Sequence, residues 1–259
     1  MKGFDVEGSG QFTYCTDTGC QAAIVQQAAH VVFQSRDGGS NPTSPLHRIR
    51  VSPIPTIVAR TILEKHHYLH SLPGGTMLVF GVFLDQELLG ALTFGAGPAQ
   101  AYRLVDRARP DDCMTLTRLW LSDRLPGNSE TRVIGVVLRN LKKYTSLKFL
   151  ISYADPVHGH LGIIYQATGW IYTGLSSAMP LYDLGDGKVR HCRSLSHAYG
   201  TRSIKYLTDH GVTVKRISQT GKHRYIYFLD PSWRPRLTTP TLPYPKKGIE
   251  HEEAKNENH

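Results

Sequence analysis

The sequence predicts a mixed α/β domain organised around a central β-sheet. Between residues 56 and 229, segments with helical periodicity alternate with short apolar or alternating segments that are typical of strands. Their order is helix, hairpin, strand, helix, strand, helix and strand, which favours one mixed sheet with helices packed on it. Hydrophobic residues make up 40 % of the 259-residue chain, enough to build a sizeable core.

The domain is predicted to begin with a helix and a hairpin. Residues 56–69 place apolar side chains on one helical face, and Pro55 precedes them, as is common where a helix starts. Residues 77–84 and 87–94 are apolar runs separated by only two polar residues, which predicts a β-hairpin. The predicted helix ends in a cluster of imidazole and phenol side chains: His66, His67, Tyr68 and His70.

A strand and an amphipathic helix follow. Residues 115–122 alternate, so that Leu116, Arg118 and Trp120 share one face. The turn at residues 126–129 can cap a helix. The apolar stripe of that helix consists of Ile134, Val137, Leu138 and Leu141. The remaining predicted elements are a central strand at residues 148–154, a helix at 161–168, and strands at 170–173 and 222–229.

Composition divides the chain into three parts. Residues 1–50 combine an alanine-rich helical segment with a turn-rich linker, residues 51–230 form the globular domain, and residues 231–259 are predicted to be a mobile tail. No apolar run is long enough to span a membrane, and the amino end lacks an export signal. The four cysteines are scattered, which favours reduced thiols. We therefore expect a cytoplasmic protein.

The net charge of +9 is concentrated in the basic segment, residues 188–224. This segment contains nine Lys and Arg against one acid, Asp209. Such a density attracts a polyanion, and four tyrosines within or next to it (199, 206, 225 and 227) would stack on unpaired bases. The alternative is an ordinary solvated basic face. The predicted nucleic-acid contacts are Arg190, Arg193, Arg202, Lys205, Lys215, Arg216, Lys222 and Arg224.

Three polar residues lie at the ends of buried elements or inside them. Asp155 follows an apolar strand, and strand carboxyl ends are favoured ligand sites, although many such residues only shape turns. Tyr165, in the next helix, is either a hydrogen-bond donor and general acid or a core tyrosine. Arg118 lies on a partly buried strand and needs a partner, for which Asp155 is the expected residue.

Two kinds of ligand site are also indicated. The N-terminus of the helix after residue 128 offers free backbone N–H groups that can bind an anion, although most such turns merely cap and Glu130 would repel a pyrophosphate. His66 and His70 lie one helical turn apart and, with Asp155, would bind a divalent metal. His67, His158 and His160 belong to the same group of histidines.

Several segments, taken in order, resemble a known family. They are His67-Tyr68 with Ser71, LTRLWLS at 116–122, NSETR at 128–132, ISYAD at 151–155, GHLG at 159–162 and IYQATGW at 164–170. Together they resemble the Mom family of phage DNA-modifying proteins and its GNAT-like relatives, over roughly residues 55–230. The loop at residues 127–132 does not have the Arg/Gln-x-x-Gly-x-Gly/Ala pattern that most GNAT acetyltransferases use for coenzyme A.

The resemblance implies a GNAT-like fold, with a central mixed, mostly antiparallel sheet flanked by helices. It implies an enzyme that adds an acetamido (methylcarbamoyl) group to N6 of adenine in double-stranded DNA and so protects the DNA from restriction. The implied catalytic residues are Tyr68, Arg118, Ser129, Asp155 and Tyr165. An acyl donor such as acetyl-CoA would bind at Leu121, Asn128, Ser129 and Arg132. Iron or another divalent metal would bind at His67, Tyr68 and Asp155.

This chemistry sets a minimum for the site, and two rival functions remain open. Adenine N6 is a poor nucleophile, so a base such as Asp155 and a donor such as Tyr165 or Arg118 would be needed. In a duplex the adenine must also leave the stack.

The first rival function is that of an N-acyltransferase for a small amine, a protein or an aminoacyl group. The second is a non-catalytic nucleic-acid-binding protein, and a homodimer is open in each case.

Overall fold

The structure is a computed structural model that describes part of the chain. The described residues are 4–6, 9–12, 44–178, 180–186, 189–191, 195, 199–201 and 203–246. The predicted helix near residue 21, most of the linker, and the predicted contacts Arg193 and Arg202 lie outside them, as does the chain from residue 247. Within residues 1–43 the structure describes only β1 (Phe4–Val6) and β2 (Ser9–Phe12), which pair antiparallel.

The chain divides into two compact units, each described separately below. The sheet unit comprises Met1–Tyr153, Gly162–Thr173 and Tyr225–Tyr244. The basic unit comprises Ala154–Leu161, Gly174–Arg224 and Pro245–His259. The chain leaves the sheet unit after β7 and again after β8, and it returns to that unit in β12.

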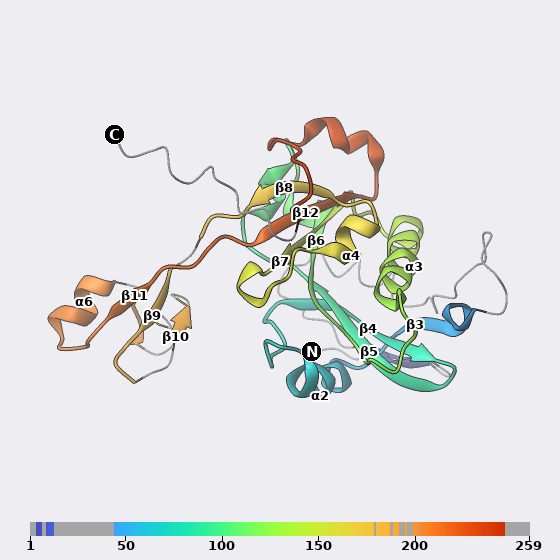
Figure 1. Ribbon diagram of the computed structural model, residues 1–259, viewed down its shortest axis with the longest axis horizontal. Helices are drawn as coiled ribbons and strands as arrows, with labels where there is room; N and C mark the ends of the chain where they lie inside the picture. Colours follow the sequence, from blue (N-terminus) through green and yellow to red (C-terminus); the bar gives the residue numbers. More distant parts are fainter. Residues whose placement is uncertain are drawn as a thin grey trace. The chain divides into compact units, whose positions relative to one another are not determined.

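The sheet unit is built on a seven-stranded mixed sheet (Figure 1). Its strand order is β3-β4-β5-β6-β7-β12-β8. The pairs from β3 to β6 are antiparallel, whereas β6 and β7 are parallel. The expected GNAT-like, mixed and mostly antiparallel sheet is therefore confirmed. The strands are β3 (Ile49–Pro53), β4 (Thr76–Leu84), β5 (Glu87–Gly95), β6 (Cys113–Leu121), β7 (Phe149–Ala154), β8 (Ile171–Leu175) and β12 (His223–Phe228).

The β4–β5 hairpin has the predicted register. Leu84 lies opposite Glu87, so Asp85 and Gln86 form a two-residue turn in which Asp85 adopts a φ of 57°. The left-handed conformation is one that an aspartate tolerates in tight hairpin turns. An ion pair between Arg48 and Asp85 ties the turn to the chain just before β3.

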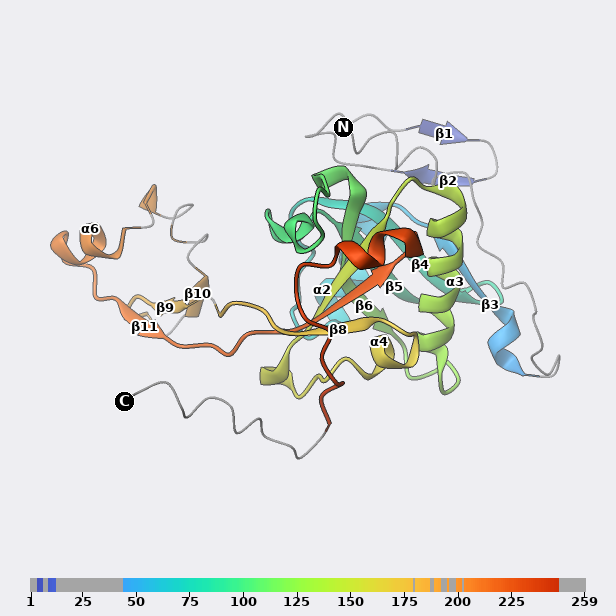
Figure 2. The same ribbon diagram turned by 90° about the horizontal axis from the view of Figure 1, so that it is seen from above.

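Three helices flank the sheet. In α2 (Thr56–His66), buried Ala59 and Leu63 pack with Val79 and Ala91 on the sheet. In α3 (Ser129–Tyr144), the four predicted stripe residues are all buried, which confirms the amphipathic interpretation. Figure 2 shows α3 running alongside the sheet. Helix α3 contacts α4 (Ile163–Ala167) and β3.

The first helix ends earlier than the sequence predicts. The backbone of His67 is extended, with φ −77° and ψ 138°, although its N–H still donates to the carbonyl of Leu63. His70 then turns with a φ of 44°, and its ring nitrogen lies 3.0 Å from the carbonyl oxygen of Glu64. The expected spacing of His66 and His70 by one helical turn is therefore wrong.

The segment after β12 is packed on the sheet unit as far as Tyr244. A short 3-10 helix, η5 (Pro231–Arg236), follows β12, and the carbonyl of Arg236 accepts a 2.8 Å hydrogen bond from the N–H of Asp106. The hydroxyl of Tyr244 donates to the carbonyl of Trp170 at 2.8 Å. This part of the chain differs from the mobile tail predicted from its proline content, because its backbone groups are bonded to the sheet unit.

The basic unit contains a small sheet that the sequence patterns did not predict. Its strand order is β10-β9-β11, and both pairs are antiparallel. Its elements are β9 (Leu181–Asp183), β10 (Val189–His191), β11 (Lys215–Ile217), α6 (Ile204–Asp209) and η4 (Pro156–His158). In neither unit does a described helix have the length and apolar character needed to cross a membrane.

Candidate active site

The central sheet opens between its two parallel strands. The register of β6 and β7 ends with Leu116 opposite Ser152, whereas β6 continues to Leu121 with β5 as its partner. The hydroxyl of Ser152 donates to the carbonyl of Leu116 at 3.1 Å, so a side chain closes the ladder where the strands separate. Such an opening exposes strand backbone groups at the carboxyl end of the sheet, where α/β proteins bind ligands.

Arg118 lies on β6, two residues beyond this point. Its Nε donates to the carbonyl of Ser71 at 3.1 Å, its Nη2 to Oγ of Ser71 at 3.3 Å, and its Nη1 to the carbonyl of Thr117 at 2.7 Å. Burial lowers the pKa of the guanidinium, and nearby Tyr68 partly opposes this change. Because all these acceptors are neutral oxygens, the positive charge of Arg118 is not balanced by a contacting carboxylate among the described residues.

Tyr165 of α4 reaches the same opening. It is buried, and it shares a hydrogen bond with Ser152. This hydrogen bond lowers the pKa of the phenol, but burial outweighs it. Burial raises the pKa of Tyr165 to about 12. At neutral pH the residue is thus a protonated phenol, suited to donate a proton or a hydrogen bond.

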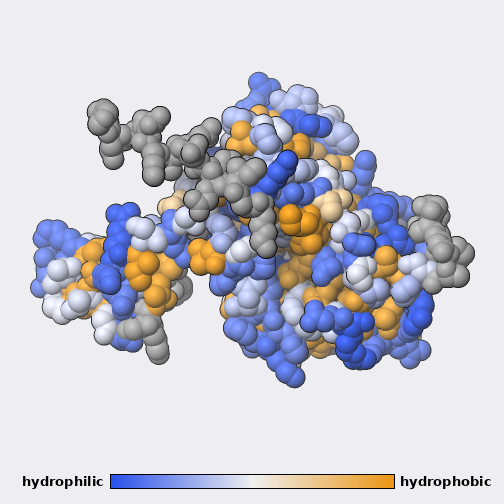
Figure 3. Space-filling view, viewed as in Figure 1, coloured by the Kyte–Doolittle hydropathy of each residue, from blue (hydrophilic) through white to orange (hydrophobic). Residues whose placement is uncertain are grey.

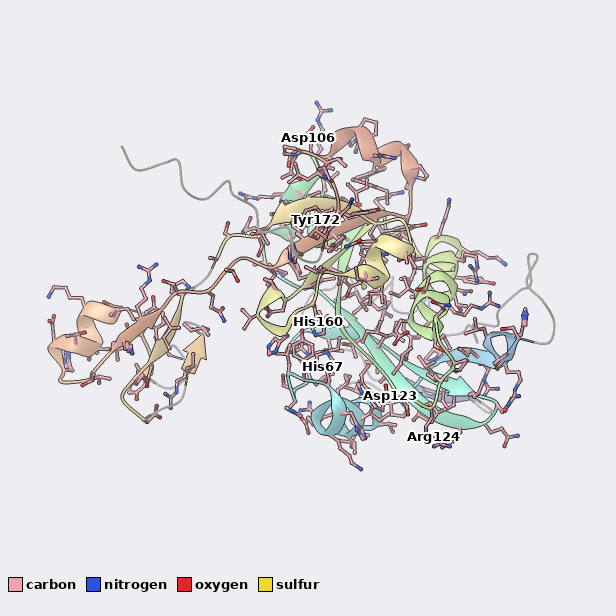
Figure 4. All side chains as sticks on the ribbon, in the orientation of Figure 1. His67, Asp106, Asp123, Arg124, His160 and Tyr172 are labelled. Atoms are coloured by element: carbon pink, nitrogen blue, oxygen red, sulfur yellow. The ribbon has the colours of Figure 1, made fainter. Side chains whose placement is uncertain are left out.

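Tyr68 and His67 lie just before Ser71, whose carbonyl and hydroxyl accept hydrogen bonds from Arg118. Tyr68 is close enough to influence the pKa of both Arg118 and Tyr165, so each of these two side chains lies within electrostatic reach of Tyr68. The ring of His67 stacks on Tyr68 with centroids 4.4 Å apart, and its Nδ1 accepts the N–H of Leu69 at 3.1 Å. Figure 4 shows His67 at the end of α2. The structure therefore brings four predicted site residues together in the sheet unit.

Asp155 belongs to the basic unit, where it forms an ion pair with Lys222. Oδ2 lies 2.7 Å from Nζ of Lys222, and Oδ1 accepts the N–H of Val157 at 3.1 Å. Burial pushes the pKa of Asp155 up, but the hydrogen bond and charge of Lys222 outweigh it, so the net pKa is lowered. The predicted pair of Arg118 with Asp155 stays a prediction, since the two residues belong to different units; within its own unit Arg118 contacts Ser71 and Thr117, and Asp155 pairs with Lys222.

The turn before α3 leaves an uncapped helix N-terminus. Asn128 adopts a left-handed conformation with φ 69° and makes no side-chain capping hydrogen bond. Ser129 is buried, and its hydroxyl donates to the carbonyl of Pro126, so it shapes the turn and is not available to a ligand. Leu121 ends β6, and half-buried Arg132 lies in the first turn of α3. The free N–H groups fit a phosphate, and exposed Glu130 opposes it only weakly because water screens its charge.

The structure gives no support to the predicted metal site. The described residues contain no group of three or more His, Cys, Asp and Glu side chains that could hold a metal ion. The neutral imidazole of His67 carries its proton on Nε2, because Nδ1 accepts a hydrogen bond. Neither ring nitrogen then offers a lone pair to a metal, so the donor set of His67, Tyr68 and Asp155 does not fit.

The predicted nucleic-acid contacts differ in their availability. Lys215 and Arg216 are exposed, Lys205 pairs with Asp209 at 2.7 Å, and Arg190 pairs with Asp186. Of the four tyrosines, Tyr199 and Tyr206 are exposed, whereas Tyr225 is fully buried among Tyr165 and Tyr172. A stacking role for Tyr225 is therefore wrong, because strand β12 places its ring in the core.

No sequence pattern distinguishes two residues of the site from ordinary serines. Ser71 and Ser152 lie within segments that carry the family resemblance, but neither was selected as a functional residue. Their importance depends on Arg118 and Tyr165, which contact them across the fold. A lone serine in a loop or strand has no periodicity or spacing that would distinguish it.

Gly162 fixes the position of Tyr165, and replacing it should be costly. It caps α4 with a φ of 73°, and an added Cβ would lie 2.8 Å from Cζ of Tyr225 and 3.0 Å from Cδ2 of Tyr165. We expect Gly162→Ala to lower the free energy of unfolding by about 3 kcal/mol, from backbone strain and overpacking together. Gly169→Ala is the matched control, since it has a φ of 77° with nothing within 4 Å, and should cost only about 1 kcal/mol. If urea unfolding showed that both variants lose the same free energy of unfolding, the packing argument would be contradicted.

The pair of Asp155 and Lys222 should make stability depend on pH. A carboxylate whose pKa is lowered by folding stabilises the protein above its unfolded pKa, and this contribution is lost as the pH falls through the folded pKa. Lys222→Met should therefore lower the free energy of unfolding by about 1 kcal/mol near pH 7 and by almost nothing near pH 2. The effect at pH 7 is small because the Lys222 side chain is 41 % exposed and water screens its charge. Urea unfolding at both pH values tests this. Lys205→Met, which removes an exposed pair, should change little at either pH.

The fold and the site together define a class. A mixed, mostly antiparallel sheet that opens between two parallel strands and is flanked by helices has the architecture of GNAT-like proteins. Within that class the chain belongs to the Mom protein family, whose family model matches residues 48–246. It is 32 % identical over 210 residues to the methylcarbamoylase Mom of Escherichia phage Mu, and the match covers 76 % of this chain and 84 % of the relative.

Two of the solved structures with a similar arrangement are acetyltransferases. An IAA acetyltransferase from Bacillus cereus matches with a TM-score of 0.39 and 12 % identity, covering 70 % of this chain and 99 % of that one. An N-acetyltransferase from Staphylococcus aureus matches with a TM-score of 0.39 and 10 % identity, covering 70 % and 97 %. Because these similarities are weak, the fold assignment depends on the strand order and register described above.

Proposed function

We propose that this protein is a DNA-modifying transferase that attaches a methylcarbamoyl (acetamido) group to N6 of adenine. Its membership of the Mom family and its identity to a methylcarbamoylase support the type of reaction. The basic segment supports a polyanionic substrate, which we take to be double-stranded DNA in the cytoplasm of a host cell. Modified adenine would then protect that DNA from restriction enzymes.

The observation that carries the proposal is the unbalanced charge of Arg118 at the opening of the sheet, which Tyr165 also reaches through Ser152. A half-buried guanidinium that contacts only neutral oxygens is ready to stabilise an anion, and a transferred carbonyl group develops negative charge on its oxygen. A phenol with a pKa near 12 can donate to the same oxygen or protonate the leaving group. A purely structural arginine would more often be buried with a carboxylate partner.

The proposed reaction assigns a separate role to Asp155 and to Tyr165. The bond from N6 to the transferred carbon forms while the bond between that carbon and the donor breaks. The amine loses a proton, for which Asp155 is the proposed acceptor, and Tyr165 gives a proton to the departing group. With Lys222 in place Asp155 is a weak base, since its pKa is lowered. A DNA phosphate that attracts Lys222 would make Asp155 more basic.

An acyl-CoA donor fits the described residues better than a metal does. The uncapped N-terminus of α3 and Arg132 would hold phosphate groups of the donor, and the open edge of β6 would hold its amide-containing arm. When bound, a donor of this kind would have to carry the whole transferred group, including its amide nitrogen, on an activated carbonyl carbon. The side chains of Arg118 and Tyr165 would then orient that carbonyl and exclude water from it.

Mass spectrometry of nucleosides tests the proposal. Plasmid DNA from bacteria that express the protein should contain a modified deoxyadenosine, and DNA from cells with the empty vector should not. Unaltered nucleosides together with an acylated protein or small amine would instead favour the N-acyltransferase alternative. Unaltered nucleosides with intact DNA binding would favour a non-catalytic binding protein.

A further inference from the structure

One face of the small sheet in the basic unit combines an aromatic ring with two guanidinium groups. On the central strand β9, Tyr182 lies directly opposite Arg190 of β10 and Arg216 of β11. Residues that are opposite one another on neighbouring strands point to the same face of a sheet. We call this row of Arg190, Tyr182 and Arg216 the Tyr182 face.

The other face of the same sheet has a different character. Leu181 and Ile217 are opposite each other there, and Asp183 lies opposite Lys215. That face carries one negative charge, from Asp183, for the one positive charge of Lys215, together with apolar groups. The surface over β9, β10, β11 and α6 accordingly shows blue hydrophilic side chains with orange hydrophobic ones between them (Figure 3). The positive charge of the sheet is therefore concentrated on the Tyr182 face.

The two arginines of this face differ in their present partners. Arg216 is exposed and has no ion-pair partner among the residues that the structure describes in this unit. Arg190 is half-buried and forms a bidentate pair with Asp186, so a phosphate would bind it in exchange for that carboxylate. Exposed Tyr199 lies close enough to Arg190 to influence its pKa, which adds a second aromatic ring to this region.

We propose that the Tyr182 face binds an unstacked nucleotide of the DNA substrate, with the base on Tyr182 and flanking phosphates on Arg190 and Arg216. This inference rests on the proposed function, because an enzyme that extrudes adenine must also hold the disrupted strand. Aromatic rings stack on any unpaired base, and guanidinium groups bind phosphates through paired hydrogen bonds. The two arginines are two strand spacings apart, about 10 Å, which suits phosphates on either side of one base.

The test measures DNA affinity by fluorescence anisotropy, with a single-stranded oligonucleotide and a fully paired duplex of the same sequence. Tyr182→Leu should lower affinity for the single strand about tenfold and for the duplex less than twofold, because only unpaired bases can stack. Tyr182→Phe should bind like the unaltered protein. Equal weakening on both DNAs, or a Phe variant as weak as the Leu variant, would overturn the stacking role.

A charge-matched pair of variants tests the face itself. Arg216→Gln should weaken binding to both DNAs and reduce the slope of log affinity against log salt by about one. Lys246→Gln removes the same charge from an exposed lysine outside the small sheet, and should change affinity less than twofold. Equal effects of the two variants would show undirected attraction and contradict the proposal.

These measurements do not depend on the chemistry of the active site. If the unaltered protein leaves nucleosides unmodified while Tyr182→Leu still weakens single-strand binding selectively, the binding site is retained and the proposed reaction fails. If nucleosides are modified but the Tyr182 and Arg216 variants bind as tightly as the unaltered protein, only the inference about this face fails.

Discussion

Replacing Tyr165 by Phe should reduce DNA modification at least about 100-fold while leaving DNA affinity unchanged. The substitution removes only the phenolic hydroxyl, which shares a hydrogen bond with Ser152 where β6 and β7 separate. Ser152 retains its bond to the carbonyl of Leu116, so no buried donor loses its acceptor and the fold should lose no more than about 1 kcal/mol. Quantitative nucleoside mass spectrometry and a DNA-binding titration measure the two effects.

Tyr225→Phe is the matched control for this change. Tyr225 has its ring 5.3 Å from that of Tyr165, is fully buried, and has its pKa raised to about 12 by the same cause, burial. Its hydroxyl accepts a 3.1 Å hydrogen bond from Gln166 and does not contact Ser152 or Arg118. We expect modification to continue at a nearly normal level. A comparable loss in both variants would show that packing of the tyrosine cluster, and not the Tyr165 proton, supports activity.

Replacing Arg118 by Met should lower modification by a factor of about 100 to 1,000. The guanidinium places a positive charge at the opening of the sheet, and removing one donor to a developing oxyanion has an effect of this size. Arg118→Lys keeps the charge but cannot contact the carbonyl and hydroxyl of Ser71 together, so it should recover only part of the activity. A purely structural role predicts instead that the Met variant loses activity only in proportion to its fraction unfolded.

Arg124→Met provides the control for loss of an arginine. Arg124 lies apart from His67 in Figure 4 and pairs with Glu87 on the β4–β5 hairpin, with its side chain 65 % exposed. Exposed pairs contribute little to stability, so the free energy of unfolding and the extent of modification should both stay near their normal values. Activity lost to the same extent in this variant would indicate a general dependence on surface charge.

The elements that the sequence predicts well have strong local patterns. The stripe of Ile134, Val137, Leu138 and Leu141 recurs at helical spacing, and all four residues are buried in α3. The β4–β5 hairpin follows from two apolar runs joined by two polar residues. In both cases the signal lies within one segment, where backbone geometry alone decides which residues share a face.

The elements that the sequence misses depend on distant contacts. The strands of the small sheet are only three residues long, too short for an alternating pattern to be recognised. Nothing in the local sequence ends α2 at His66, since no Gly or Pro follows until Pro73. Residues 231–244 read as a proline-rich tail, yet hydrogen bonds from Leu242 to Tyr172 and from Tyr244 to Trp170 hold them on the sheet unit.

The sequence by itself determined the mixed α/β class, the order of the main elements, the basic segment and the family resemblance that selects Arg118, Asp155 and Tyr165. Only the tertiary structure decided what those residues contact. In the structure Arg118 donates a hydrogen bond to Ser71, Tyr165 shares a hydrogen bond with Ser152, and Asp155 forms an ion pair with Lys222. The ring of Tyr225 lies in the core. The reason is physical: periodicity fixes the face of an element, whereas a hydrogen bond or an ion pair depends on which distant element the fold places opposite it.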